Sequence, residues 1–188
     1  IRNIALSLPV GFKLAVKEHP VSIGYRPVGY YKKLLAIPNV VLISSFTKSR
    51  ALVQGCKLVA VVSGSIGFEA LVCRKPVIVI GNAPFQILPR TMIRAINGYP
   101  ELAREIEDLL STYALDEDAL EKYVAAVMET GVPVNFYTDL LKRKDGYKES
   151  ADELGDTFDE QVDLLSRFIV NKALENETIS SKNRENSS

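Results

Sequence analysis

Short apolar strands alternate with helices along the first half of the sequence. Strands are predicted at residues 13–19, 39–44, 57–62 and 76–80, with helices between them at 30–37, 47–55 and 67–73. These strands are rich in β-branched residues and apolar on both faces, which is typical of a parallel sheet covered by helices on each side. The sequence therefore predicts an α/β fold with a doubly wound parallel sheet.

Helices dominate the predicted structure after Gly81. They are expected at 100–113, 116–130 and 158–174, and the charged segment 142–156 is expected to be an exposed loop. Residues 175–188 are polar and poor in apolar side chains, so burial cannot offset the entropy of ordering them. We expect one domain over residues 1–174, followed by a disordered tail at 175–188.

Composition excludes several classes of function. The chain has 23 basic residues (Lys and Arg) and 23 acidic residues (Asp and Glu). It therefore has no overall positive electrostatic field that would attract nucleic acid or an anionic membrane. The apolar runs are far shorter than the roughly 20 residues that cross a bilayer. Cys56 and Cys73 fit unpaired core thiols of a cytoplasmic protein, and no cluster of side chains has the spacing of a metal site.

A stretch rich in glycine and serine, "SGSIGFEA" at residues 63–70, joins a predicted strand to a predicted helix. Ligands of open α/β sheets bind at the carboxyl ends of the strands, where this stretch lies. Gly64 and Gly67 allow a sharp turn and close approach to a ligand, and the free N–H groups of a helix start favour a phosphate. The stretch therefore predicts a phosphate cradle.

Two serines and a glutamate complete this predicted site. Ser63 and Ser65 add hydroxyl groups, and Glu69, four residues beyond Ser65, lies on roughly the same helix face. A carboxylate there can accept hydrogen bonds from the vicinal hydroxyls of a ribose. Purely structural roles stay open, because such turns also join strands to helices for steric reasons and Glu69 suits the helix dipole. The stretch has only two of the glycines of G-x-G-x-x-G and lacks the lysine of a P-loop, which excludes those generic nucleotide sites.

A second polar stretch, "VKEHP" at residues 16–20, ends the first predicted strand. Lys17 and His19 are two residues apart, so in an extended chain they project to the same side. An ammonium group and an imidazole there could bind a diphosphate or a phosphoester. The alternative is that His19 only hydrogen-bonds a neighbouring loop.

The order and spacing of several motifs carry a resemblance to a known family. These motifs are "VKEHP" (16–20), "GYRP" (24–27), "YYKKL" (30–34), "IPNVVLIS" (37–44), "VVSGSIGFEAL" (61–71) and "KPVIVIG" (75–81). The chain resembles bacterial capsular and surface polysaccharide glycosyltransferases, a group that includes the Kdo transferases using CMP-Kdo. The resemblance covers about residues 1 to 90. It implies the Rossmann-like, nucleotide-sugar-binding C-terminal half of a GT-B enzyme.

The resemblance implies a role for each matching residue. Glu69 resembles the helix acid that holds the donor ribose, and Lys17 and His19 resemble a K-x-H-P pair that faces the phosphate and stabilises the departing nucleotide. Arg26 is a further anion contact. The implied donor-nucleotide site comprises Lys17, His19, Arg26, Ser63, Gly64, Ser65, Gly67 and Glu69. The catalytic base is unknown, with His19 and Lys17 as candidate leaving-group stabilisers.

The resemblance also implies parts and partners outside residues 1–188. The family has an N-terminal domain that binds a glycan or glycolipid acceptor, and the central strand expected to open the C-terminal half would precede Ile1. Residues 1 to 8 would then be the end of the next helix. We expect a CMP- or UDP-linked sugar as donor substrate, no cofactor, no nucleic-acid partner and no transfer by this chain alone. The full-length enzyme is expected in the cytoplasm, where it could associate with the inner face of the membrane or form oligomers.

Two further function classes stay open. The first is a sugar-nucleotide epimerase of the related two-domain fold, which would be expected to carry additional catalytic acids and histidines, whereas His19 is the single histidine here. The second is a non-catalytic interaction module of a polysaccharide assembly complex.

Overall fold

The computed structural model describes residues 1–132, 134, 143–144, 147–148 and 157–185. The chain divides into two compact units, Ile1–Ala126 and Val127–Ser188. The division between the units falls inside helix α6 (Glu117–Thr130), and the domain over residues 1–174 stays a prediction. All of the candidate site residues belong to the first unit.

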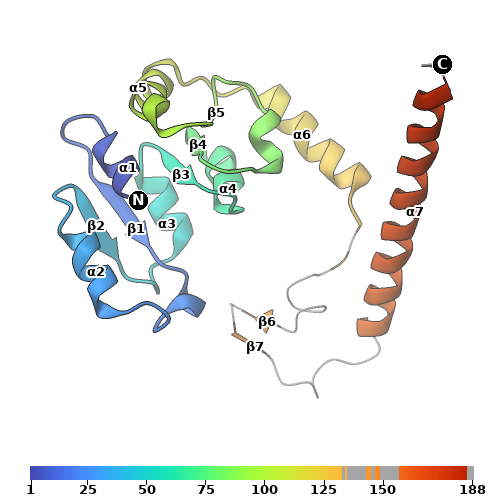
Figure 1. Ribbon diagram of the computed structural model, residues 1–188, viewed down its shortest axis with the longest axis horizontal. Helices are drawn as coiled ribbons and strands as arrows, with labels where there is room; N and C mark the ends of the chain where they lie inside the picture. Colours follow the sequence, from blue (N-terminus) through green and yellow to red (C-terminus); the bar gives the residue numbers. More distant parts are fainter. Residues whose placement is uncertain (133, 135–142, 145–146, 149–156, 186–188) are drawn as a thin grey trace. The chain divides into compact units, whose positions relative to one another are not determined.

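Five parallel strands form the centre of the first unit, in two sheets (Figure 1). β1 (Leu14–Lys17) pairs with β2 (Val40–Ile43). β4 (Val77–Val79) lies between β3 (Val59–Val61) and β5 (Ile93–Ala95). The prediction of an α/β protein with parallel strands is confirmed, although the strands are hydrogen-bonded as two sheets and not as one.

Helices connect these strands in the predicted alternation. They are α1 (Arg2–Leu6), α2 (Val28–Leu35), α3 (Ser49–Gly55), α4 (Ile66–Val72) and α5 (Leu102–Thr112), with short 3-10 turns η1 (Pro20–Ser22), η2 (Pro84–Ile87) and η3 (Tyr99–Glu101). Asp116 caps the N-terminus of α6, because its carboxylate accepts a hydrogen bond from the Ala119 amide over 2.9 Å.

The three-stranded sheet is covered on both faces. Val77 and Val79 of β4 pack in one core cluster with residues of α4, and Ile78 packs in a second cluster with residues of α5. All three β4 side chains are fully buried. Because successive side chains of a strand point to opposite faces, this burial requires helices on each side of the sheet, which is the doubly wound arrangement.

Helix α1 and the residues that follow it contact both sheets. Ile4 and Leu8 pack in the α5 cluster with Ala60 of β3, while Ala5 packs in a third cluster with β1 and β2. The side-chain amide of Asn39 donates to the Ala5 carbonyl oxygen, which ties α1 to the start of β2. The prediction that residues 1 to 8 are largely helical is confirmed by α1.

One edge of β1 and one edge of β3 pair with no strand of the described residues. The Leu14 amide donates a hydrogen bond over 2.7 Å to the carbonyl oxygen of Asn39, on the β2 side. The Val59 amide donates one over 3.0 Å to the carbonyl oxygen of Pro76, on the β4 side. Because backbone groups of successive strand residues point to alternate sides, those of Ala15, Lys17 and Ala60 point to the unpaired edges. Neither edge therefore joins the β1–β2 sheet to the β3–β4–β5 sheet.

The part after Gly81 departs from the prediction in one important respect. The sequence predicted helices there and missed β5, whose central residue is the charged Arg94. Apolar residues flank this arginine on both sides, from Met92 to Ile96, and this short apolar run was the available signal. The prediction of helices alone after Gly81 was therefore wrong.

The second unit contains one short hairpin and one long helix. β6 (Arg143–Lys144) pairs antiparallel with β7 (Tyr147–Lys148) within the predicted exposed loop 142–156, and the rest of that loop lies outside the described residues. α7 (Thr157–Glu185) continues beyond the predicted end at 174. Residues 175–185, expected in a disordered tail, are therefore helical here, and 186–188 lie outside the described residues.

Candidate functional site

The turn between β3 and α4 carries the first group of candidate residues. β3 ends at Val61, and Ser63, Gly64 and Ser65 follow it as exposed residues before α4 begins at Ile66. Ser65 is the N-cap residue, but its side chain makes no capping hydrogen bond. The hydroxyl group of Ser65 is therefore not occupied by the helix that it precedes.

The polar side chains of this turn have no partner within the described part of the chain. Glu69 lies in the first turn of α4 and is exposed, as Ser63 and Ser65 are. No hydrogen bond or ion pair occupies the carboxylate of Glu69 or the hydroxyl groups of the two serines in that part. The turn thus presents two hydroxyl groups and one carboxylate to solvent at the carboxyl end of a parallel strand.

Gly67 has a packing role that the sequence did not predict. A Cβ at this position would lie 2.7 Å from the Phe85 ring and 3.0 Å from Val61 Cγ2. Only a residue without a side chain lets α4 approach β3 and η2 this closely. Gly64 differs, because the nearest atom to its Cβ position is Ile66 Cγ2 at 3.8 Å. The phosphate contact proposed for Gly67 stays a prediction, whereas its steric role is a property of the fold.

A further glycine, Gly81, fixes the neighbouring strand end. A Cβ there would lie 2.6 Å from the Val62 carbonyl oxygen, so the chain after β4 passes directly against the residue that precedes Ser63. The "PVIVIG" motif included Gly81, but its steric role depends on two chain segments that only the fold brings together.

Lys17 and His19 lie at the carboxyl end of β1. Lys17 is the last strand residue, and the His19 carbonyl oxygen accepts a hydrogen bond from the Ser22 amide over 2.8 Å as η1 begins. The strand was predicted to continue to residue 19. Because β1 ends at Lys17, the argument that extended backbone projects both side chains to the same side does not apply, and their joint contact with a phosphate stays a prediction.

Glu18, between these two residues, was not singled out by sequence reasoning. Its Oε1 lies 3.1 Å from Arg26 Nε and its Oε2 accepts a hydrogen bond from the Tyr31 hydroxyl over 2.6 Å. The Arg26 guanidinium also lies 4.6 Å from the centre of the Tyr30 ring, in cation–π contact. The hydrogen bond to Glu18 is the main reason that the pKa of Tyr31 is raised above its ordinary value. Arg26 is therefore held against the end of β1.

The two groups of candidate residues follow strands of different sheets. Lys17, His19 and Arg26 lie at the end of β1, while Ser63 and Glu69 follow β3. Each group occupies the carboxyl end of a parallel strand, the position where open α/β sheets bind ligands. Their convergence on one ligand stays a prediction.

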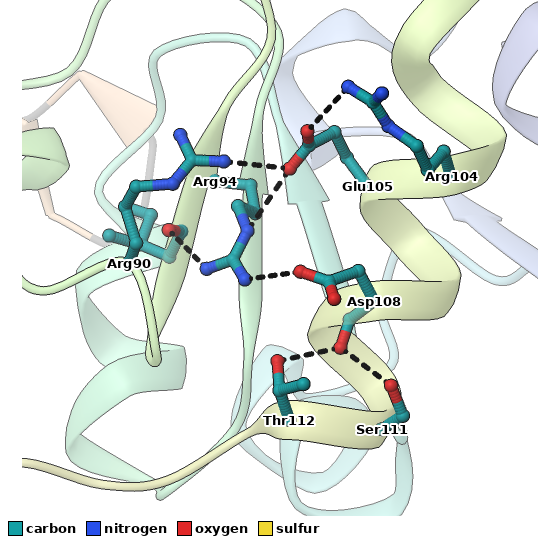
Figure 2. A network of polar contacts seen from close by, with 8 residues as sticks. Arg90, Arg94, Arg104, Glu105, Asp108, Ser111 and Thr112 are labelled. Carbon is teal, nitrogen blue, oxygen red and sulfur yellow. Dashed lines mark hydrogen bonds and ion pairs between the residues drawn. The ribbon is translucent and has the colours of Figure 1, made fainter.

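Another network of charged side chains joins β5 to α5 (Figure 2). Arg94 Nη2 lies 2.6 Å from Asp108 Oδ2, and Arg94 Nε lies 3.1 Å from Glu105 Oε2. Glu105 also pairs with the exposed Arg90 and Arg104 at 3.0 and 3.4 Å. Because the carboxylates of Glu105 and Asp108 pair with the buried Arg94, this network joins α5 to the edge strand β5.

Among the described residues, no group of three or more His, Cys, Asp or Glu side chains could hold a metal ion. None of the helices described is long and apolar enough to cross a membrane. Cys56 and Cys73 are free, half-buried thiols, and burial raises the pKa of Cys56.

These features define an α/β protein of the Rossmann-like class with polar residues at its strand ends. The family model described as capsule polysaccharide biosynthesis protein matches residues 3–123, more than half of the chain. The chain therefore belongs to the capsule polysaccharide biosynthesis protein family, which supports a role in capsule synthesis. Searches of the curated proteins and of the solved structures gave no match.

Proposed function

We propose that this chain is the donor-nucleotide-binding part of a glycosyltransferase of capsule polysaccharide biosynthesis. Its substrate would be a CMP- or UDP-linked sugar, with CMP-Kdo as the first donor to test, in an enzyme of GT-B architecture. The observation that carries the proposal is a set of polar side chains after β3 that have no partner among the described residues, namely Ser63, Ser65 and Glu69. Membership of the capsule family supports the choice of a sugar donor.

Each side chain has a distinct task in the proposed site. The carboxylate of Glu69 accepts hydrogen bonds from the two ribose hydroxyls, and the serine hydroxyls with the backbone at Gly64 contact the phosphate. Lys17 and His19 supply positive charge and a hydrogen-bond donor to the phosphate as the nucleotide departs. Charge that develops on a leaving group is stabilised most effectively by donors that are already in place.

The acceptor and the transfer step belong to the whole enzyme. In GT-B architecture the acceptor lies in the cleft between two domains, and the donor half holds the nucleotide. We therefore propose that this chain binds the nucleotide and that a second domain supplies the acceptor. The test for this chain is consequently binding, and not turnover.

The experiment compares ribonucleotides with their 2′-deoxy forms by calorimetry. We expect CMP or UDP to bind, the deoxy form to bind more weakly, and Glu69→Ala to remove that difference because the hydroxyl reader is gone. Glu107→Ala changes another exposed glutamate, in α5, and serves as the matched control. Lack of binding by CMP, UDP and CMP-Kdo to the unaltered chain, or discrimination that persists in Glu69→Ala, would contradict the proposal.

A further inference from the structure

Glu18 holds side chains from two other chain segments with its two oxygens. Oε1 pairs with Arg26 Nε at 3.1 Å, and Oε2 accepts the Tyr31 hydroxyl at 2.6 Å. The Glu18 side chain is only 18% exposed, while that of Arg26 is 51% exposed. A carboxylate that is this enclosed and has both oxygens engaged holds its partners in one arrangement.

Arg26 is fixed on one edge and on one face. Its Nε edge meets Glu18 and its face lies over the Tyr30 ring, 4.6 Å from the ring centre. Among the described residues, the two terminal nitrogens of the guanidinium have no hydrogen-bond partner. Those nitrogens form the edge of the guanidinium that can bind two oxygens of a phosphate at once.

The chain places this guanidinium at the carboxyl end of β1. Glu18 directly follows Lys17, the last residue of the strand, so the ion pair brings Arg26 to the strand end from eight residues further along the chain. Without the carboxylate, a long arginine side chain on an exposed loop samples many rotamers. The ion pair therefore determines where the free edge of Arg26 lies.

We propose that Glu18 is a positioning residue, which holds Arg26 so that its free guanidinium edge contacts a phosphate-type anion at the end of β1. This inference rests on the proposed donor site and adds to it the residue that orders one of its cations. Glu18 itself does not touch the anion.

The direction in which Glu18→Gln changes the affinity for the anion distinguishes a positioning role of Glu18 from simple charge repulsion. A carboxylate near an anion site repels the anion, so removal of its charge alone should strengthen anion binding. If Glu18 positions Arg26, Glu18→Gln should instead weaken binding, because the guanidinium is no longer held in place. In an Arg26→Met background no cation remains to be positioned, and the same substitution should then strengthen binding or leave it unchanged.

The experiment measures binding of inorganic pyrophosphate by calorimetry to the full chain. We expect Glu18→Gln to weaken it about tenfold, the equivalent of one charge-assisted hydrogen bond. Asp118→Asn removes the same charge from an exposed ion pair with Lys122 in α6 and should leave binding unchanged. The unfolding midpoint of each variant is measured alongside, and Tyr31→Phe, which removes one of the two contacts to Glu18, should weaken binding less.

A spectroscopic readout tests the arrangement without any ligand. The Arg26 Nε–H resonance should exchange slowly with water in the parent chain and quickly in Glu18→Gln, whereas Tyr31→Phe should preserve it. The positioning role is overturned if this resonance is unaffected by Glu18→Gln, or if that variant binds pyrophosphate as tightly as the parent or more so. A parent that binds CMP with ribose discrimination but does not bind pyrophosphate overturns the inference and leaves the proposed function standing. A parent that binds neither pyrophosphate nor any of CMP, UDP and CMP-Kdo overturns both.

Discussion

Arg94 Nη2 in β5 lies 2.6 Å from Asp108 Oδ2 in α5, and this ion pair fastens the edge strand of the three-stranded sheet to its covering helix. The Arg94 side chain is only 7% exposed, and its Nε also lies within 3.1 Å of the enclosed Glu105 carboxylate. A buried charge tolerates loss of its partners poorly, because the remaining charge must stay away from water without compensation.

Arg94→Met should therefore destabilise the fold. We expect a loss of about 1–3 kcal/mol in the free energy of unfolding, measured by urea denaturation with circular dichroism, because the enclosed Glu105 keeps Arg90 and Arg104 but loses Arg94, and the half-exposed Asp108 loses its ion pair. Asp118→Asn breaks an exposed pair and should change stability by less than about 1 kcal/mol. Equal, small effects of the two substitutions would show that the Arg94 network contributes little to stability.

Gly67→Ala should destabilise the protein through a steric contact. The new Cβ would lie 2.7 Å from the Phe85 ring, and relief of that overlap should cost about 1–3 kcal/mol in the free energy of unfolding. A Cβ at position 64 would meet Ile66 Cγ2 at an ordinary contact distance of 3.8 Å, so Gly64→Ala should not destabilise the protein. The cost of Gly67→Ala should also shrink in a Phe85→Leu background, and an unchanged cost there would argue against this contact.

Amide hydrogen exchange rates should differ between the paired and the unpaired edges of β1 and of β3. The amides of Ala15, Lys17 and Ala60 point to unpaired edges and should exchange quickly, while those of Leu14 and Val59 donate to neighbouring segments and should exchange slowly. NMR-detected exchange on the monomeric chain measures this directly. Strong protection at Ala15 and Ala60 would mean that another strand pairs there in solution.

Tyr31 should make stability depend on alkaline pH. Its pKa in the folded protein is raised, first by its hydrogen bond to Glu18, so the unfolded chain loses this proton at lower pH than the folded chain does. The stabilisation is fully present below the ordinary tyrosine pKa of about 10 and is lost as pH rises through the raised pKa. Near-ultraviolet titration should show one late-titrating tyrosine disappear in Tyr31→Phe and move to lower pH in Glu18→Gln, while Tyr113, whose pKa is raised by burial, still titrates late in both variants. A titration curve that is identical in parent and Glu18→Gln would contradict the hydrogen bond.

Local sequence patterns predicted the strands and helices of residues 1–80 with small errors in their bounds. β2 and β4 lie within the predicted 39–44 and 76–80, and α4 begins one residue before the predicted 67. These elements could be predicted because β-branched apolar runs, helix periodicity and glycine stops act within a few neighbouring residues. β5 was missed because its central residue is an arginine, and a charge in a short strand becomes acceptable only when a distant helix supplies carboxylates.

The candidate site likewise has features that the sequence predicts and features that it does not. Local sequence patterns predict that polar residues follow β1 and β3 at their carboxyl ends, because each motif is contiguous with its strand. They do not predict that Glu18 holds Arg26 and Tyr31, that Gly67 makes room for Phe85, or that the parallel strands pair as two sheets. Each of these features is a contact or a pairing between separate chain segments, and its energy depends on distances that no local pattern of residues contains.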